Sequence, residues 1–266
     1  MSRRRFYSPP ENFSDDGARV ALSREETRHL AGSLRLAAGE EVYVFDGAGR
    51  EFLCTVAADD DVRSGAGRGA TLEVRGEVEP SCAESPLGLT LCVALLKGEK
   101  FDLVVQKATE LGAVGIHPVE TARADVKLPR GERGEGARKR VERWRRIAVE
   151  AAKQSGRARV PRVAEPSSLK GLLAEDFAGA AGAESPRLIF TERGGRSLVG
   201  AAGAWAEKPA RVAALVGPEG GWEEAEIRQA VESGWEPVTL GGRVMRAETA
   251  GIVVAALLQH LCGDLV

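Results

Sequence analysis

The sequence predicts an α/β protein in which a small β-rich domain precedes a larger domain built on a parallel sheet. From residue 89 onward, short apolar runs alternate with helical patterns, as in a βαβ unit. The residues before 79 contain several short strand patterns and one helix, which suggests a small barrel. The stretch 77–88 is rich in Pro and Ser and has no periodicity, so we expect domains 1–78 and 79–266 to be joined there.

The expected N-terminal elements follow from alternation and turn residues. Ser23 and Glu26 have the spacing of a capping box, which opens a helix through about Leu34. The glycine turn D-G-A-G-R-E lies between two strand patterns and predicts a hairpin. An acidic, glycine-rich stretch, 59–69, predicts a surface loop. The predicted strands are 20–22, 42–45, 52–56 and 70–78.

The C-terminal elements are expected to alternate between strand and helix. Val104, Val105, Ala108 and Leu111 give the helix over 101–111 an apolar side, and Gly112 ends it. Glu223, Glu224 and Glu226 load the first turns of a later helix whose inner stripe is Ile227, Ala230 and Val231. A terminal helix is expected over about 248–261. The predicted strands are 89–96, 114–119, 186–191, 212–216 and 238–240.

Two glycine-rich loops each follow a predicted buried strand, G-P-E-G-G-W after 212–216 and Gly241-Gly242 after 238–240. Open α/β sheets bind their ligand at the carboxyl ends of their strands. The loops match neither the phosphate loop G-x-x-x-x-G-K-[ST] nor the dinucleotide fingerprint G-x-G-x-x-G. Glu219 places a carboxylate where an anion would lie, so a neutral or cationic ligand fits better, such as an adenosine that carries a sulfonium.

These loops and two further segments carry a resemblance to a known family. The segments are G-P-E-G-G-W-x-x-x-E, L-G-x-R-x-M-R-x-E-T-A, L-L-K-G-E-K-F-D-x-V-V-Q-K-A-T-E-L-G and R-W-R-R-I-A-V-E-A-A-K-Q-S-G-R. They resemble the RsmE family of the SPOUT superfamily, which methylates N3 of a uridine in 16S ribosomal RNA. The resemblance implies S-adenosylmethionine as cofactor, a knotted C-terminal SPOUT domain, a PUA-like RNA-binding domain at the N-terminus, and a homodimer. Periodicity alone would not predict a knot.

Methylation of uracil N3 requires removal of its proton, so a base or a cation that stabilises the ring anion is expected. Arg246 and Glu248 supply one of each and are the predicted catalytic residues. The alternative is that they pair with each other and cap the last helix. The residues predicted to bind the cofactor are Thr191, Glu192, Leu215, Val216, Gly217, Glu219, Gly220, Gly221, Leu240, Gly241, Met245, Arg246, Thr249 and Ala250.

The stretch 123–162 contains 14 Lys or Arg but only 5 Asp or Glu in a chain of net charge −2, which is typical of a surface that binds a polyanion. A solvated helix face is the alternative. Arg143, Ile147, Glu150, Gln154 and Arg157 are expected along one helical face. The predicted RNA-binding residues are Arg3, Arg4, Arg5, Tyr7, Lys97, Lys100, Arg123, Arg143 and Arg157, and the resemblance to the RsmE family adds His29 and Arg35.

Composition limits the remaining classes. The chain has 266 residues, 43% of them hydrophobic, without a membrane-length apolar run or a signal peptide, so a cytoplasmic protein is expected. Four scattered cysteines and three histidines predict neither a metal site nor a disulfide framework. Two rival functions are a ribose 2′-O-methyltransferase, whose Asn-x-Gly-x-x-x-Arg motif and Ser-Asn pair have no counterpart here, and an RNA-binding module that has lost catalysis.

Overall fold

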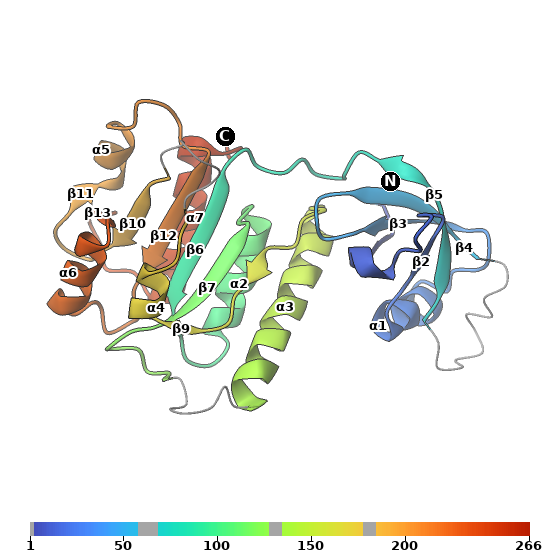
Figure 1. Cartoon of the computed structure of the whole chain (residues 1–266), viewed down its shortest axis with the longest axis horizontal. Coiled ribbons are helices and arrows are strands. Elements are labelled where there is room, and N and C mark those ends of the chain that lie inside the picture. Colours follow the sequence, from blue (N-terminus) through green and yellow to red (C-terminus); the bar gives the residue numbers. More distant parts are fainter. Residues whose placement is uncertain (1–2, 58–68, 128–134, 178–184) are drawn as a thin grey trace. The chain divides into compact units, whose positions relative to one another are not determined.

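The computed structural model describes residues 3–57, 69–127, 135–177 and 185–266, and the chain divides into two compact units (Figure 1). The first unit comprises Met1–Glu84 with Val149–Val160, and the second comprises Ser85–Ala148 with Pro161–Val266. No local pattern predicts that Val149–Val160, which follows a long part of the second unit in the chain, packs with the first unit. All but one residue of the predicted loop 59–69 lies outside the described residues.

The first unit is built on a five-stranded mixed sheet of order β1-β3-β4-β5-β2, so the predicted small β-rich unit is confirmed. Strand β1 pairs with β3 in parallel, whereas the other neighbours are antiparallel. The hairpin turn is held by Asp46, whose Oδ1 accepts from the backbone N–H groups of Ala48, Gly49 and Arg50. The strands are β1 (Arg5–Tyr7), β2 (Arg19–Ala21), β3 (Glu41–Phe45), β4 (Glu51–Val56) and β5 (Thr71–Val78).

The helix of this unit begins as predicted but ends early. Ser23 accepts a hydrogen bond from the backbone N–H of Glu26 and caps α1 (Arg24–Arg28). The Glu26 carboxylate accepts two bonds of 2.8 Å from Lys153 of the segment that joins this unit. The helix continues as a π-helical turn, His29–Ser33, and the chain then reverses at Arg35 with a φ of 53°. A 3₁₀ turn, Pro10–Asn12, precedes β2.

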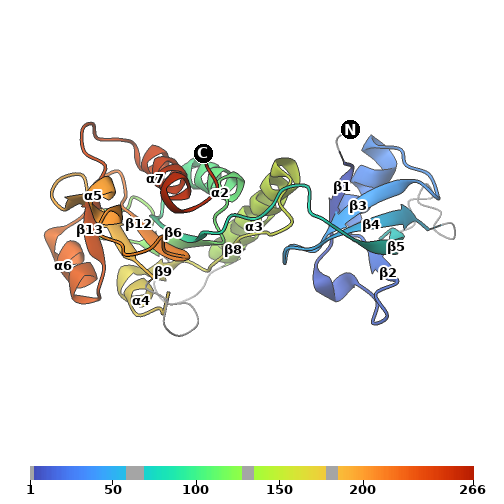
Figure 2. The same cartoon turned by 90° about the horizontal axis from the view of Figure 1, so that it is seen from above.

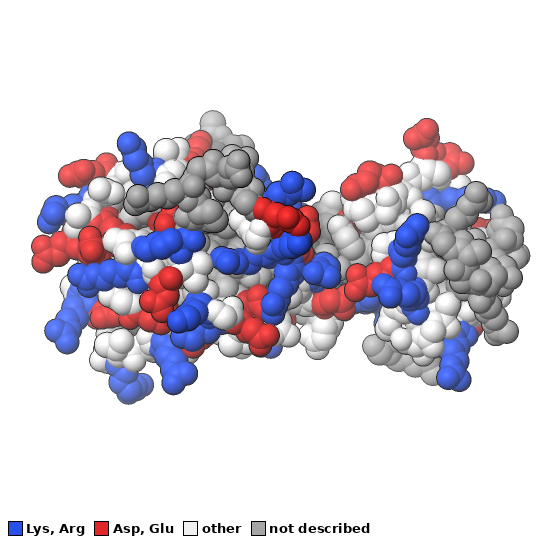
Figure 3. Space-filling model, turned by 90° about the horizontal axis from the view of Figure 1, so that it is seen from below, with Lys and Arg blue, Asp and Glu red and all other residues white. Residues whose placement is uncertain are grey.

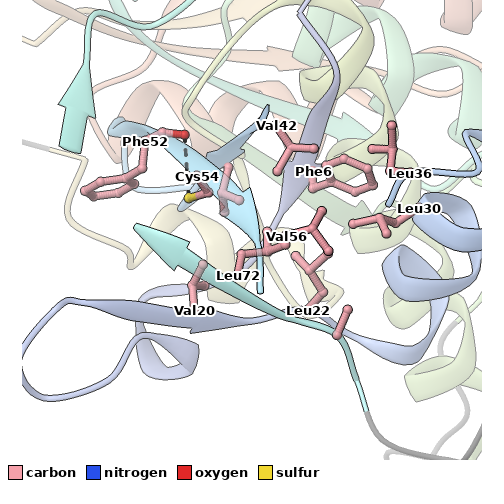
Figure 4. Close-up of a cluster of buried hydrophobic side chains, with 12 residues drawn as sticks. Phe6, Val20, Leu22, Leu30, Leu36, Val42, Phe52, Cys54, Val56 and Leu72 are labelled. Carbon is pink, nitrogen blue, oxygen red and sulfur yellow. Dashed lines mark hydrogen bonds between the residues drawn. The ribbon is translucent and has the colours of Figure 1, made fainter. Parts of the chain in front are cut away.

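Alternating side chains of this sheet form the core of the first unit, as Figure 4 shows. Val42 and Val44 on β3 and Cys54 and Val56 on β4 belong to one buried cluster, which also includes Leu30 of the π-helical turn. Each such side chain contributes roughly 1.5–3 kcal/mol through burial. Because Leu30 belongs to this core, the π-helical turn is anchored to the sheet.

The second unit contains an eight-stranded sheet in which every pairing is parallel, which confirms the predicted parallel sheet. Its order is β11-β13-β10-β12-β6-β7-β8, with β9 also paired to β7. The strands are β6 (Gly88–Ala94), β7 (Gly115–Glu120), β8 (Arg162–Val163), β9 (Ser167–Ser168), β10 (Arg187–Phe190), β11 (Arg196–Ser197), β12 (Arg211–Val216) and β13 (Glu236–Thr239). The helices are α2 (Lys100–Glu110), α3 (Glu135–Ser155), α4 (Leu169–Leu173), α5 (Leu198–Ala202), α6 (Glu224–Glu232) and α7 (Ala247–Cys262), and the part of α3 from Val149 onward belongs to the first unit.

Helices cover both faces of this sheet (Figure 2). Helices α2 and α7 lie on one face, and α4 and α6 lie on the other. On β6, Cys92 faces the α4 and α6 side, while its neighbour Val93 contacts Gly251 of α7. Burial on both faces explains why the central strands are continuous apolar runs.

Two details of the helices differ from the predictions. Val231 of α6 was predicted to face inward but is 47% exposed. Near the start of the same helix, Glu226 is buried instead and forms a capping box with Glu223. Helix α3 ends at Ser155, and Gly156 turns the chain with a φ of 84°. Arg157 therefore does not continue the predicted helical row. Within the described residues, no helix is long and apolar enough to cross a membrane.

A buried ion pair joins the N-terminal strand to the rest of the first unit. Arg5 donates to Glu51 at 3.1 Å and to the backbone carbonyl of Arg157 at 2.9 Å. Burial alone would raise the pKa of Glu51, but its bonds to Arg5 and to the backbone N–H of Ser81 outweigh burial and lower it. The pair therefore contributes stability above the ordinary glutamate pKa, and this contribution is lost as the pH falls through the lower pKa of the folded state.

We expect Glu51→Ala to lower the free energy of unfolding by about 3–5 kcal/mol at neutral pH, because it leaves the Arg5 guanidinium buried without its partner. Urea unfolding followed by circular dichroism measures this. Below about pH 4 the difference from the unsubstituted protein should shrink. Glu73→Ala, which removes an exposed partner of Arg75, is the control and should change stability by at most about 0.5 kcal/mol. Equal effects of the two substitutions would contradict the assignment.

Candidate ligand site at the edge of the parallel sheet

Three neighbouring strands of the second unit end at the same level. Phe190, the last residue of β10, pairs with Val216 at the end of β12 and with Val238 near the end of β13. Because the strands are parallel, their following loops leave from the same edge of the sheet. The two glycine-rich loops are therefore neighbours, as predicted, with the loop after β10 between them.

Side-chain and backbone bonds tie these loops together. The indole Nε1 of Trp222, in the loop after β12, donates to the carbonyl of Phe190 at 2.8 Å. The backbone N–H of Thr191 donates to the carbonyl of Val238 at 2.8 Å, and the Thr191 hydroxyl lies 3.2 Å from the same oxygen. The three loops thus form one structure that is held at its base.

The loops and α7 enclose a hollow of about 600 Å³, including the part that opens to solvent. Residues of β10 and its loop, of the loops after β12 and β13, and of α7 line it. They are Phe190, Thr191, Glu192, Val216, Gly217, Pro218, Gly221, Trp222, Thr239, Leu240, Gly241, Arg243, Val244, Met245, Ala247, Ala250 and Val254.

Glycine is required at two places in these loops. A Cβ on Gly217 would lie 2.9 Å from the Trp222 ring, closer than side-chain contacts allow, so a larger residue would displace the indole from Phe190. Gly241 and Gly242 have φ angles of 68° and 67°, which other residues adopt at a cost. The glycine at 217 makes room for the Trp222 ring, and the pair Gly241-Gly242 lets the loop after β13 reverse.

The charges of the site differ from the prediction at Glu219. Its carboxylate does not line the hollow but forms a 2.6 Å ion pair with Lys100, and this bond holds the Glu219 pKa below its usual range although burial would raise it. The carboxylate that lines the hollow belongs to Glu192, which lies near Gly221. Arg243 also lines it, so the site carries one charge of each sign and suits a ligand with both charges.

The structure brings most of the predicted cofactor residues together. Nine line the hollow, namely Thr191, Glu192, Val216, Gly217, Gly221, Leu240, Gly241, Met245 and Ala250. The other five do not, namely Leu215, Glu219, Gly220, Arg246 and Thr249. Leu215 is fully buried in the sheet, and Gly220 packs against Arg123.

Sequence reasoning missed several lining residues. Trp222, Arg243 and Val244 are within the quoted motifs and could have been included on position alone. Val254 follows Ala250 by four residues, a spacing that places both on one face of a helix. Phe190 had no local signal, because its role depends on its pairing with β12 and β13.

Arg246 and Glu248 occupy the start of α7. Arg246 is the exposed N-cap residue, and its side chain makes no capping bond. Glu248 is 8% exposed and is 3.9 Å from Lys100. Both residues are described, and no ion pair joins them, so the structure does not show the alternative in which they pair with each other.

The four predicted RNA contacts of the second unit differ from one another in exposure and in the groups that they bind. Lys97 is exposed in the loop before α2. Arg143 pairs with Asp102 and, at 3.4 Å, with Glu99. Arg123 donates to the carbonyl of Gly220 at 3.3 Å and therefore supports the loop after β12. Lys100 belongs to the charged cluster with Glu219 and Glu248.

The first unit has a second, wider hollow of about 1480 Å³, including the part open to solvent. It combines cations of the N-terminal strand and α1 with polar residues of the joined segment. Its lining residues are Arg3, Arg4, Arg5, Glu25, Glu26, Arg28, His29, Ser33, Leu34, Glu150, Lys153 and Gln154. Four of these residues, Arg3, Arg4, Arg5 and His29, are predicted RNA contacts.

Three other predicted RNA contacts lie apart from this wide hollow. Tyr7 is half-buried, packs against Phe45, and has a pKa that burial raises. Arg157 is 3% exposed and forms an ion pair with Glu84 at 2.6 Å, so its charge stabilises the fold of the first unit. Arg35 is exposed in its left-handed backbone conformation.

Comparisons with known proteins give a separate match for each of the two units. A family model described as an RNA methyltransferase domain matches residues 83–259, and one described as an RNA methyltransferase PUA domain matches residues 22–61. The ribosomal RNA small subunit methyltransferase E of Synechocystis is 34% identical over 97% of this chain and 77% of its own length. The protein of the same name from Bacillus subtilis is 29% identical over 97% and 96%.

Solved structures agree with these matches. A ribosomal RNA small subunit methyltransferase E from Neisseria gonorrhoeae, bound to S-adenosyl methionine, has a TM-score of 0.81 and 34% identity over the whole of both chains. A putative methyltransferase from Legionella pneumophila with bound SAM has a TM-score of 0.82 and 30% identity over the same extent. The predicted resemblance is confirmed, and the chain belongs to the RsmE family of RNA methyltransferases.

Proposed function

We propose that this chain transfers the methyl group of S-adenosylmethionine to N3 of a uridine in 16S ribosomal RNA. One observation carries the proposal: a hollow of about 600 Å³ lies where β10, β12 and β13 end, in a chain whose family is known. The Neisseria gonorrhoeae relative, which is alike over its whole length, was solved with the same methyl donor.

The residues of the hollow fit this cofactor. When bound, S-adenosylmethionine supplies an electrophilic methyl group on a positively charged sulfur. The glycine at 217 leaves room for the Trp222 ring, which also lines the hollow, and Phe190 and Val254 offer apolar surface to an adenine ring. The Glu192 carboxylate favours a positive charge, and Arg243 favours a carboxylate.

The catalytic residues of this proposal are Arg246 and Glu248. Uracil N3 carries a proton at neutral pH, so it becomes a useful nucleophile only when that proton leaves. Glu248, in the first turn of α7, offers a buried carboxylate to accept it. Arg246 is exposed at the start of the same helix and can stabilise the charge on the ring. Holding donor and acceptor in contact supplies the rest of the acceleration.

We propose that residues 1–78 bind RNA and that 79–266 carry out the transfer. The wide hollow of the first unit presents Arg4 and Arg28, both exposed, beside His29. Cations that surround an aromatic ring suit phosphate contacts and base stacking. On the face shown in Figure 3, positive and negative side chains are mixed over the second unit, so no single basic field covers it there. We assign the phosphate contacts mainly to the first unit because Arg3, Arg4, Arg5, Arg28 and Lys153 line its wide hollow.

The proposed partners are the small ribosomal subunit in the cytoplasm and a second copy of this chain. The proposal of a homodimer rests on the resemblance to the RsmE family. Light scattering that returned the mass of one chain, 28.2 kDa, would rule out the homodimer. The knotted crossing of the chain stays a prediction.

Methyl transfer to small-subunit ribosomal RNA tests the function directly. The RNA, alone and within the subunit, is taken from cells that lack this protein and is incubated with it and labelled S-adenosylmethionine. Nucleoside analysis is expected to show label in N3-methyluridine, because the site offers a base for the N3 proton.

Other outcomes separate the rival functions. Label in a 2′-O-methyl nucleoside would favour the ribose methyltransferase. RNA binding without any transfer, together with no thermal shift by S-adenosylmethionine, would favour the inactive module, since a ligand at about a hundred times its dissociation constant should add about 2.7 kcal/mol.

We expect Arg28→Ala to weaken RNA binding and to lower the slope of log affinity against log salt by about 1, because it removes one phosphate contact. Fluorescence titration at several salt concentrations measures both quantities. The control is Arg50→Ala, which removes an exposed arginine that pairs with Asp46 away from the wide hollow. If both variants lose affinity alike, the wide hollow is not the RNA site.

A further inference from the structure

Three charged side chains from three separate segments meet beside the ligand hollow. Lys100 begins α2, Glu219 is in the loop after β12, and Glu248 is in the first turn of α7. The Lys100 ammonium lies 2.6 Å from Glu219 Oε1 and 3.9 Å from Glu248 Oε2. Pro218 and Ala247, the neighbours of the two acids in the chain, line the hollow. The cluster therefore borders the place proposed for the methyl donor.

Glu248 has an unsatisfied oxygen. The residue is 8% exposed, and its Oε2 is fully buried without a hydrogen-bond partner among the described residues. Leaving such an acceptor unpaired costs roughly 1–3 kcal/mol or more. Its position in the first turn of α7 favours the negative charge but supplies no donor to this oxygen. An N–H group from a ligand would satisfy it.

Lys100 is held in place and kept charged by Glu219. That hydrogen bond raises the pKa of Lys100. The nearby Glu248 carboxylate also raises this pKa, whereas the positive charge of Arg246 lowers it. An ammonium has three donors, and the bond to Glu219 uses one of them. Lys100 can therefore donate to a ligand atom next to the one that contacts Glu248.

We propose that Lys100 is a catalytic residue, and that it and Glu248 together bind the N3 edge of the target uracil. This rests on the proposed function. Glu248 Oε2 accepts the N3–H, and Lys100 donates to the adjacent carbonyl oxygen of the ring. Cytosine presents an acceptor at N3 beside an amino donor, the reverse pattern, so the same pair would reject it.

The proton and electron pairs balance in this arrangement. The N3–H bond breaks, the proton moves to Glu248 Oε2, and the electron pair stays on the ring, where the carbonyl oxygen near Lys100 shares the negative charge. N3 then bonds to the methyl carbon as the carbon–sulfur bond breaks, and that electron pair remains on sulfur as a neutral thioether. Lys100 stabilises the charge that develops in the transition state.

The test compares Lys100→Met with Lys107→Met. Both lysines are on α2, are similarly exposed at 39% and 37%, and pair with a glutamate, but Lys107 pairs with Glu110. Single-turnover methyl transfer is measured against pH, with RNA that carries either uridine or the more acidic 5-fluorouridine at the target, and donor binding is measured by calorimetry. Lys100→Met should slow transfer at neutral pH by about 100-fold, whereas Lys107→Met should match the unsubstituted protein.

The dependence of the rate defect on pH and on the RNA identifies the role of Lys100. If Lys100 stabilises the ring anion, the defect shrinks at alkaline pH and with 5-fluorouridine, donor affinity is unchanged, and Lys100→Arg recovers part of the rate. A loss that is equal at every pH and with both RNAs, or that follows lost donor binding, would show that Lys100 only supports the fold. Full activity of Lys100→Met would refute this inference alone, whereas an unsubstituted protein without transfer to uridine would refute the proposed function.

Discussion

The parallel register of β10, β12 and β13 is the constraint on which the ligand site depends. It sets Phe190, Val216 and Val238 side by side, so that three loops begin at one level. The Trp222 bond to Phe190 and the Thr191 bond to Val238 then fix the loops to one another. A shift of one residue would turn every side chain of a strand to the opposite face and separate these contacts. The site is thus a consequence of strand pairing.

The hollows of the two units are lined by different kinds of side chain. The hollow of the second unit is formed by backbone turns and apolar side chains with one charge of each sign, which suits a small ligand that carries both. The wide hollow of the first unit is lined by four arginines and one lysine against three glutamates, an excess of positive charge that favours a polyanion. In the first unit, the buried Arg5–Glu51 pair anchors β1 directly after Arg3 and Arg4. Charge therefore has a structural role at Arg5 and a proposed binding role at its neighbour Arg4.

The sequence predicted the strands and helices where the pattern is local. The five apolar residues 212–216 form β12 within one residue, and the glycines after them mark the ligand loop. Long-range pairing was not predictable. Glu219 is 119 residues from Lys100 in the chain, so its ion pair had no local signal, and its carboxylate was expected to face the ligand. Arg157 looked like one more cation of a basic stretch, but its partner Glu84 is also distant in sequence.

Backbone amide hydrogen exchange with and without S-adenosylmethionine tests the central claim most directly, because it reports local opening along the chain. The three loops are joined at their base, so ligand in the hollow should slow exchange in 190–194, 216–222 and 239–246 together and leave α1 unchanged. Protection of one loop alone, protection confined to the first unit, or no protection at saturating ligand would contradict a methyl-donor site at the common end of these strands.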